Sequence, residues 1–356
     1  ARGFRVGTFT SPHLYNVRER IRINDEWISE EDFAGLVEKI RPATSGREKR
    51  YRTFFELITL MSFLYFREKK ADWVVYEVGM GGRLDSTNII MPRCAVINTI
   101  GLDHTETLGP TLRHIAREKA GIVKPGIPVV IGPQQEGITD YLEELALEAG
   151  GKPFLYGRDF TTEGSFLFVG REKIGPVKLI MEGEHQIRNF ACAYQALHCM
   201  GEASEERELL VRAAEKTLLG GRIEERAFRG GLWILDVGHT VESVGALYTA
   251  LRKKYPGRRL VSVVSYSRGK NLEGMLSLDF EYCRKVILTE NSSFRSASAE
   301  ELRMAAGERE GILTERDLDK ALERALAEAG PSDLIVAHGS FYLMGDIYEI
   351  MEKYKD

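Results

Sequence analysis

Residues 73–88 have the sequence WVVYEVGMGGRLDSTN, in which a short apolar run leads into a polar, glycine-rich segment. An apolar run of this length, rich in Val and aromatic residues, predicts a strand, and a cluster of glycines marks its end. In open α/β sheets, ligands bind beyond the carboxyl ends of the strands. This stretch therefore indicates both a fold class and the position of a site.

The alternation of short apolar runs with helix-period segments continues on both sides of this stretch. It indicates a parallel sheet covered by helices on both faces. A glycine-broken segment then predicts a few short antiparallel strands before a last helix. We assign residues 1–219 to this first domain. Its predicted strands are 73–78, 94–100 and 128–132, its helices 55–67, 111–120 and 185–200, and its antiparallel segment 154–181.

A second alternation begins at the glycines of 220–221, and we assign residues 220–356 to a smaller, Rossmann-like domain. The predicted fold is therefore two-domain α/β. The predicted strands of the second domain are 233–237, 259–264, 285–289 and 333–337, and its helices are 244–255, 272–279, 299–307 and 318–329.

The composition limits the possible partners. The chain has 356 residues, 29% of them charged, and a formal net charge of −4, without the dense Lys/Arg stripe that neutralises nucleic-acid phosphates. No apolar run approaches the ~20 residues of a membrane helix. The cysteines form no C-x-x-C pair, which indicates free thiols in a reducing compartment. We expect a cytoplasmic monomer that binds neither nucleic acid nor membranes. The four cysteines are Cys94, Cys192, Cys199 and Cys283.

Three residues near the ends of predicted elements could carry chemistry. Glu77 belongs to an apolar run, so its carboxylate needs a metal ion, an arginine or a backbone N–H as partner. His104 follows a strand and could ligate a metal, although a lone histidine is more often structural. Lys119 stands on a predicted helix just before Gly121, where most lysines are solvated surface charges.

Eight segments, in this order along the chain, resemble motifs of the folylpolyglutamate synthase/dihydrofolate synthase family of the Mur ligase superfamily. Each is weak or moderate alone, but together they cover nearly the whole chain. They are TSPHL (10–14), TFFE (53–56), the run 77–88, GLDHT (101–105) with Leu108-Gly109, EKAGI (118–122), His185-Gln186 with Asn189, GRIE (221–224) and GSFYLMG (339–345).

The resemblance implies an ATP-dependent ligase. ATP would phosphorylate the carboxylate of dihydropteroate or of a reduced folate, and the amino group of L-glutamate would attack the acyl phosphate. Two Mg²⁺ ions would offset the negative charge that develops. By motif match, the catalytic residues would be Glu77, His104 and Lys119. These three and Ser11 would be the metal ligands, with Lys119 present as a carbamate.

The resemblance also assigns binding residues. An aromatic face and a carboxylate suit a flat, amide-bearing pterin, and a guanidinium suits phosphate oxygens. The residues expected to bind ATP are Asn189, Arg222, Asp236 and His239. The residues expected to bind the pterin substrate are Phe54, Phe55, Asp85 and Ser86.

The sequence departs from the family pattern in two places. It contains no glycine-rich phosphate loop. We expect an N-terminal stretch of the natural protein to supply that loop with its strand and helix; without them, strand edges and apolar surface would be exposed. The alternative is an ATP-incompetent, pterin-binding or partner-binding pseudo-enzyme. Residues 236–240 read DVGHT where the family reads Asp-Gly-Ala-His-Asn, so a Mur-type ligase with another acid acceptor also stays open.

Overall fold

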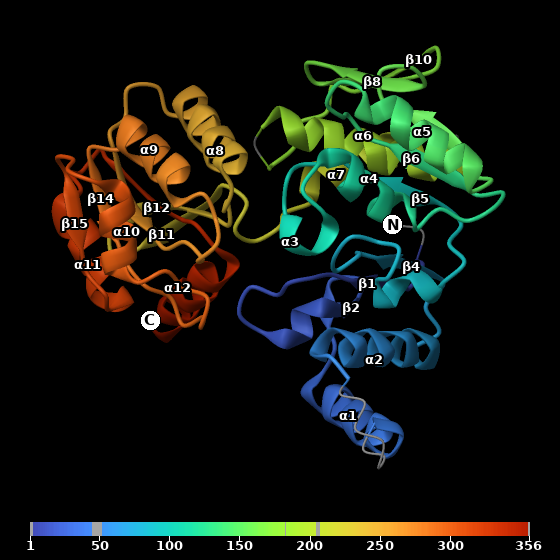
Figure 1. Ribbon diagram of the computed structural model, residues 1–356, viewed down its shortest axis with the longest axis horizontal. Helices are drawn as coiled ribbons and strands as arrows, with labels where there is room; N and C mark the ends of the chain where they lie inside the picture. Colours follow the sequence, from blue (N-terminus) through green and yellow to red (C-terminus); the bar gives the residue numbers. More distant parts are fainter. Residues whose placement is uncertain (1–2, 45–51, 182, 204–206, 355–356) are drawn as a thin grey trace. The chain divides into compact units, whose positions relative to one another are not determined.

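The computed structural model describes residues 3–44, 52–181, 183–203 and 207–354. The chain forms two compact units (Figure 1). No helix among the described residues combines the length and the apolar character needed to cross a membrane. Unit 1 comprises Ala1–Pro12, Arg18–Ile180 and Glu184–Thr217, and unit 2 comprises His13–Val17, Met181–Gly183 and Leu218–Asp356.

The first sheet of unit 1 has the strand order β3-β2-β1-β4. β1 pairs in parallel with β4 and antiparallel with β2. Asn24, with a φ of 55°, makes the tight turn of the β2–β3 hairpin. Helix α2 contacts β1, and α1 contacts α2. The bounds are β1 Val6–Phe9, β2 Ile21–Ile23, β3 Glu26–Trp27, α1 Glu30–Thr44, α2 Phe54–Glu68 and β4 Trp73–Tyr76, with a 3₁₀ turn η1 at Val17–Arg20.

A second, parallel sheet of unit 1 has the order β5-β6-β7. Helices α5 and α6 both contact β6, and α4 packs on α5 (Figure 1). The antiparallel strands expected within 154–181 form a third sheet, β8 to β10. The bounds are β5 Ala95–Ile97, α3 Thr105–Leu108, α4 Leu112–Ala120, β6 Pro128–Ile131, α5 Ile138–Glu148, β7 Lys152–Leu155, β8 Phe160–Glu163, β9 Phe166–Val169, β10 Glu172–Ile174, α6 Glu184–Cys199 and α7 Arg207–Lys216.

The parallel strands predicted for unit 1 are divided between two sheets in the described residues, a mixed one that contains β1 and β4 and a parallel one that contains β5 to β7. β4 and β5 lie at the edges of two separate sheets. Three of their valines are exposed, Val74 by 38%, Val75 by 58% and Val96 by 41%. Exposed apolar side chains on edge strands are uncommon in natural proteins. The phosphate loop and its strand stay a prediction.

Unit 2 is built on a six-stranded sheet of order β11-β12-β16-β13-β14-β15, parallel except for β11. One core cluster joins the sheet to α8, α9 and α10, and another joins it to α11 and α12, so helices cover both faces. The predicted Rossmann-like alternation is confirmed. The bounds are β11 Glu224–Phe228, β12 Gly231–Asp236, α8 Val241–Lys254, β13 Leu260–Val264, α9 Leu272–Tyr282, β14 Lys285–Leu288, α10 Ala299–Ala306, β15 Ile312–Thr314, α11 Leu318–Glu328, β16 Leu334–His338 and α12 Phe341–Lys353.

A short N-terminal segment, His13–Val17, packs within unit 2. The ring of Tyr15 stacks on that of Tyr348, with centroids 5.9 Å apart. A Cβ at Gly345 would lie 2.3 Å from the carbonyl oxygen of Leu14. Only glycine allows this approach of segment and helix, which gives a structural reason for the last glycine of the 339–345 motif.

Candidate active site

The first candidate residues meet where two parallel strands of unit 1 end. Phe9 at the end of β1 is paired with Tyr76 at the end of β4. Just beyond them, the backbone N–H of Ser11 donates to Glu77 Oε2 over 2.7 Å. Glu77 is exposed and follows β4, so the prediction that it lies inside an apolar strand is wrong. Strand geometry therefore brings two of the candidate metal ligands together.

His104 and Lys119 both have Asp103 as a neighbour. His104 precedes α3 with a φ of 51°, and its Nε2 lies 3.8 Å from Asp103 Oδ2. Burial lowers the pKa of Lys119, and the charge of Asp103 opposes this shift. Lys119 is therefore not the freely solvated lysine that the sequence pattern favours.

The donor set fits a magnesium ion that takes part of its coordination from a substrate. Within the described ranges, no three His, Cys, Asp or Glu side chains are grouped so as to hold a metal by themselves. Ser11 and Glu77 supply a hydroxyl and a carboxylate, both hard oxygen donors. Mg²⁺ is usually bound by one or two carboxylates together with waters and substrate phosphates, not by an all-protein cage.

The glycine-rich loop after β4 is held closed by Asp85. Its Oδ2 accepts the backbone N–H groups of Gly79 and Met80, each over 3.0 Å, and its Oδ1 accepts that of Thr87 over 2.9 Å. A Cβ at Gly79 would lie 2.4 Å from Cζ of Phe55, so the loop can approach that ring only with glycine there. Asp85 thus shapes the loop in which it was expected to contact the pterin.

The same loop is attached to the end of α4. Arg83 donates from its backbone N–H to the carbonyl oxygen of Glu118 over 2.8 Å and from Nε to the Glu118 carboxylate over 3.0 Å. Asn88 donates to the carbonyl of Gly121 over 3.0 Å. These contacts fix the loop against the turn of helix that carries Lys119. Ser86 begins a 3₁₀ turn, η2 (Ser86–Ile89), within it.

The two phenylalanines expected at the pterin begin α2. Thr53 caps this helix by accepting the N–H of Glu56, while the Glu56 carboxylate accepts the N–H of Thr53. The outer residues of the TFFE motif are therefore a capping box. Phe54 is 56% exposed, and the guanidinium carbon of Arg20 lies 5.2 Å from its ring centroid. Arg20, itself only 8% exposed, is a site neighbour that the sequence pattern did not reveal.

Asn189 lies in unit 1, on α6. Its Oδ1 accepts from Asn98 Nδ2 over 2.6 Å, and its Nδ2 donates to Gln186 Oε1 over 3.2 Å. The other three residues expected at ATP lie in unit 2, where they are neighbours of one another.

In unit 2, Asp236 ties two site loops together. Its Oδ2 accepts the N–H of Ile223 over 2.9 Å, and its Oδ1 accepts the N–H of Gly238 over 2.7 Å. Burial raises the pKa of Asp236, against the effect of these hydrogen bonds and of Arg222. Next to Gly238, Nδ1 of His239 lies 2.9 Å from the carbonyl oxygen of Val237. Asp236 thereby places Arg222 and His239 on connected loops.

A buried carboxylate supports the turn before Arg222. Glu224 accepts hydrogen bonds from the Tyr348 hydroxyl, from the N–H of Gly221 over 2.9 Å and from Arg226 over 2.7 Å. Burial raises its pKa, but these three donors outweigh burial, so the net shift is downward. A depressed pKa means that the carboxylate stabilises the fold above its unfolded pKa, and that this stability is lost as the pH falls through the folded value.

We therefore expect Glu224→Gln to lower the free energy of unfolding by about 2–3 kcal/mol at pH 7, because charged hydrogen bonds are lost. Urea unfolding of wild type and variant at pH 7 and at pH 3.5 measures this loss of unfolding free energy. The difference between wild type and variant should shrink at pH 3.5, because this pH lies below the pKa of about 4.3 of an unfolded glutamate and part of the stabilisation is then lost. A difference independent of pH would contradict the role of the charge.

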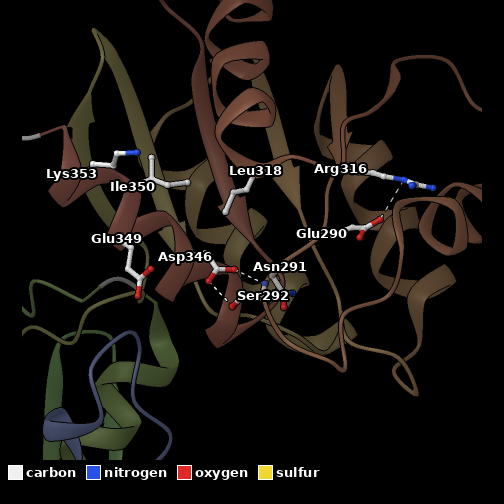
Figure 2. A pocket seen from close by; sticks show the side chains of 9 residues that line it. All are labelled: Glu290, Asn291, Ser292, Arg316, Leu318, Asp346, Glu349, Ile350 and Lys353. Atoms are coloured by element: carbon white, nitrogen blue, oxygen red, sulfur yellow. Dashed lines mark hydrogen bonds and ion pairs between the residues drawn. The ribbon is translucent and has the colours of Figure 1, made fainter.

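A pocket of about 460 Å³ lies elsewhere on unit 2 and contains none of the candidate residues. Some of its polar groups bind one another: Asp346 accepts the N–H and the hydroxyl of Ser292, both over 2.7 Å, and Arg316 Nε lies 3.8 Å from Glu290 Oε1 (Figure 2). The pocket therefore adds nothing to the candidate site. Its lining residues are Glu290, Asn291, Ser292, Arg316, Leu318, Asp346, Glu349, Ile350 and Lys353.

Family models match both units, the Mur ligase middle domain at residues 27–197 and the Mur ligase glutamate ligase domain at residues 221–341. The dihydrofolate synthase/folylpolyglutamate synthase of Bacillus subtilis is 31% identical over 362 residues, which cover 97% of this chain and 84% of that protein. The chain belongs to the folylpolyglutamate synthase/dihydrofolate synthase family. It is an ATP-dependent ligase with the two-domain, Mur-ligase-like α/β fold, as the motifs predicted.

Solved structures of this family have the same fold as this chain. The folylpolyglutamate synthase of Mycobacterium tuberculosis, complexed with ADP and AMPPCP, superposes with a TM-score of 0.89 at 28% identity over 99% of this chain and 86% of that chain. Escherichia coli FolC in complex with DHPP and ADP gives a TM-score of 0.89 at 26% identity over 99% of this chain and 83% of that one. A family structure from Yersinia pestis, 27% identical over 98% of this chain and 83% of that chain with a TM-score of 0.87, contains AMPPNP and a manganese ion.

Proposed function

We propose that this ligase joins L-glutamate to the carboxylate of dihydropteroate, of a reduced folate, or of both, through an acyl-phosphate intermediate. The observation that carries the proposal is the contact between Ser11 and Glu77, 2.7 Å from nitrogen to oxygen, at the ends of neighbouring parallel strands. It supports the proposal because the backbone of Ser11 lies against the Glu77 carboxylate, in a chain whose relatives are named dihydrofolate synthase/folylpolyglutamate synthase.

Different residues of this chain would bind the metal ions, the phosphates and the pterin. Ser11, Glu77, His104 and Lys119 would hold two magnesium ions, which would offset the charge developing between phosphates and acyl oxygen. Arg222 would bind phosphate oxygens, because its planar guanidinium matches their geometry. Phe54 and Phe55 would present aromatic faces to the pterin. The closed loop held by Asp85 would keep its backbone fixed beside the ring of Phe55.

Phosphate release from ATP by the intact, mass-verified protein tests the function. We expect release with magnesium only when L-glutamate and either dihydropteroate or tetrahydrofolate are both present, and the active pterin names the acceptor. D-Glutamate is the matched control, since it has the same charge and size. No release with either pterin, from a protein that still binds the pterin, would favour the binding-protein alternative; release with another acid would favour a different acceptor.

The lowered pKa of Lys119 supports a carbamate, because carbon dioxide adds only to the neutral amine. Lys119→Met should lower turnover about 100-fold, comparable to losing one group that stabilises charge in the transition state. In carbon-dioxide-free buffer the wild type should lose most of its turnover and regain it with bicarbonate, while Lys119→Arg should not respond. A wild type indifferent to bicarbonate would contradict the carbamate.

A further inference from the structure

One aromatic ring of unit 2 lies beside both a cation and an imidazole of the candidate nucleotide site. The guanidinium carbon of Arg222 is 5.6 Å from the ring centroid of Phe341. The ring of His239 is 6.0 Å from it, centroid to centroid, at an interplanar angle of 59°. Arg222 precedes β11, His239 follows β12 and Phe341 follows β16, so three separate parts of the chain meet at this ring.

The position of Phe341 is fixed by the turn before it. Gly339 has a φ of 125°, and a Cβ there would lie 2.6 Å from the carbonyl oxygen of Ser265, so the turn requires glycine. Ser340 caps α12 by accepting the N–H of Leu343 over 3.0 Å. Phe341, the first residue of the helix, is partly buried against the core that contains Leu343 and Met344. The ring is therefore a rigid support.

The loops that carry the two partners are also fixed. Asp236 holds the N–H groups of Ile223 and Gly238, the residues that follow Arg222 and precede His239. An arginine side chain nevertheless keeps several rotatable bonds, and backbone contacts do not orient its guanidinium. A ring face attracts the guanidinium electrostatically and reduces the number of orientations it samples. The ring of Phe341 therefore fixes the orientation of the Arg222 guanidinium, which the backbone contacts do not fix.

We propose that Phe341 is a positioning residue for ATP: its ring orients the guanidinium of Arg222 toward the phosphates and supports the imidazole of His239. This inference rests on the nucleotide role given to Arg222 in the proposed function. In this inference, Phe341 contacts the side chains of Arg222 and His239, which bind ATP, and does not contact the reacting atoms. Phe341 should therefore affect nucleotide affinity more than the rate of the chemical step.

Titration calorimetry of the full chain with Mg-ATP tests the inference. Phe341→Leu should raise the Kd about three- to tenfold, the range of a partly exposed cation–π contact. Phe341→Tyr should stay within about twofold of wild type, because it keeps the ring. The matched control is Tyr342→Leu, on the next residue and 49% exposed, which should leave the Kd unchanged. In steady-state assays, Phe341→Leu should raise the KM for ATP and leave kcat near wild type.

A double-mutant comparison separates positioning from a general effect. In a background that carries both Arg222→Ala and His239→Ala, adding Phe341→Leu should change the Kd by less than about twofold, because both groups that the ring positions are already absent. An equal effect in both backgrounds, or no effect of Phe341→Leu in the wild type, would overturn the inference. So would a wild type that binds no Mg-ATP. If ATP binds and Phe341→Leu weakens it, but phosphate release never needs glutamate, the proposed function fails while this inference stands.

Discussion

The Glu77→Gln variant is expected to lose at least about 100-fold of its magnesium-dependent turnover, because it removes a charged ligand without changing its shape. Glutamine keeps an oxygen that can accept the N–H of Ser11, now 2.7 Å from Glu77 Oε2. Since Glu77 is exposed beyond the end of β4, the melting temperature should change little. Phosphate release with magnesium, glutamate and pterin measures the effect.

Two comparisons make this result specific. Glu148→Gln, at an exposed position at the end of α5, removes the same charge from the same unit and should leave turnover unchanged. Raising the magnesium concentration should restore part of the turnover of Glu77→Gln, because a weaker site fills at higher metal concentration. Full turnover of Glu77→Gln at ordinary magnesium would show that this carboxylate is not a metal ligand.

The sequence predicted most of the regular fold because its long strands are apolar and its helices are periodic. Helices α1, α5, α7 and α12 were not predicted. Strands β11 and β15 were also missed: β11 contains Glu224, Glu225 and Arg226, and β15 has only three residues. Edge strands face water on one side, so they lack the continuous apolar run that reveals a central strand. The β2–β3 hairpin left a readable signal, Asn24-Asp25 between Ile23 and Glu26, which is a turn pair of the kind that favours tight hairpins.

Parts of the candidate site follow from sequence and parts do not. Residues just beyond neighbouring parallel strands must meet, so the proximity of Ser11 and Glu77 could be anticipated once both strands were recognised. The hydrogen-bond partners of a site side chain could not be anticipated from the sequence. Asp85 satisfies backbone N–H groups of its own loop. The approach of Phe341 to Arg222 needs the whole sheet of unit 2, since the two residues are far apart in the chain.

Asp279→Ala is expected to have the largest effect on stability, a loss of about 3–5 kcal/mol of unfolding free energy, because buried partners would be left unpaired. Asp279 is 0% exposed. It accepts from the hydroxyl of Tyr248 over 2.5 Å and from that of Tyr266 over 2.7 Å, and Nε2 of His338 lies 2.8 Å from it. Urea unfolding at pH 7, read by tyrosine and tryptophan fluorescence, measures the loss.

The same network predicts how stability depends on alkaline pH. Burial, and next the charge of Asp279, raise the pKa of both Tyr248 and Tyr266 well above the usual value. A raised folded pKa stabilises fully below the unfolded pKa of about 10, and that stability is lost as the pH rises above it. Tyr248→Phe should therefore flatten the alkaline limb of the curve of unfolding free energy against pH. Tyr282→Phe, which changes a ring stacked on Tyr248 with centroids 4.8 Å apart, should not.

For Asp279→Ala, an unfolding free energy within about 1 kcal/mol of wild type would contradict the network, because an unpaired buried donor alone costs about that much.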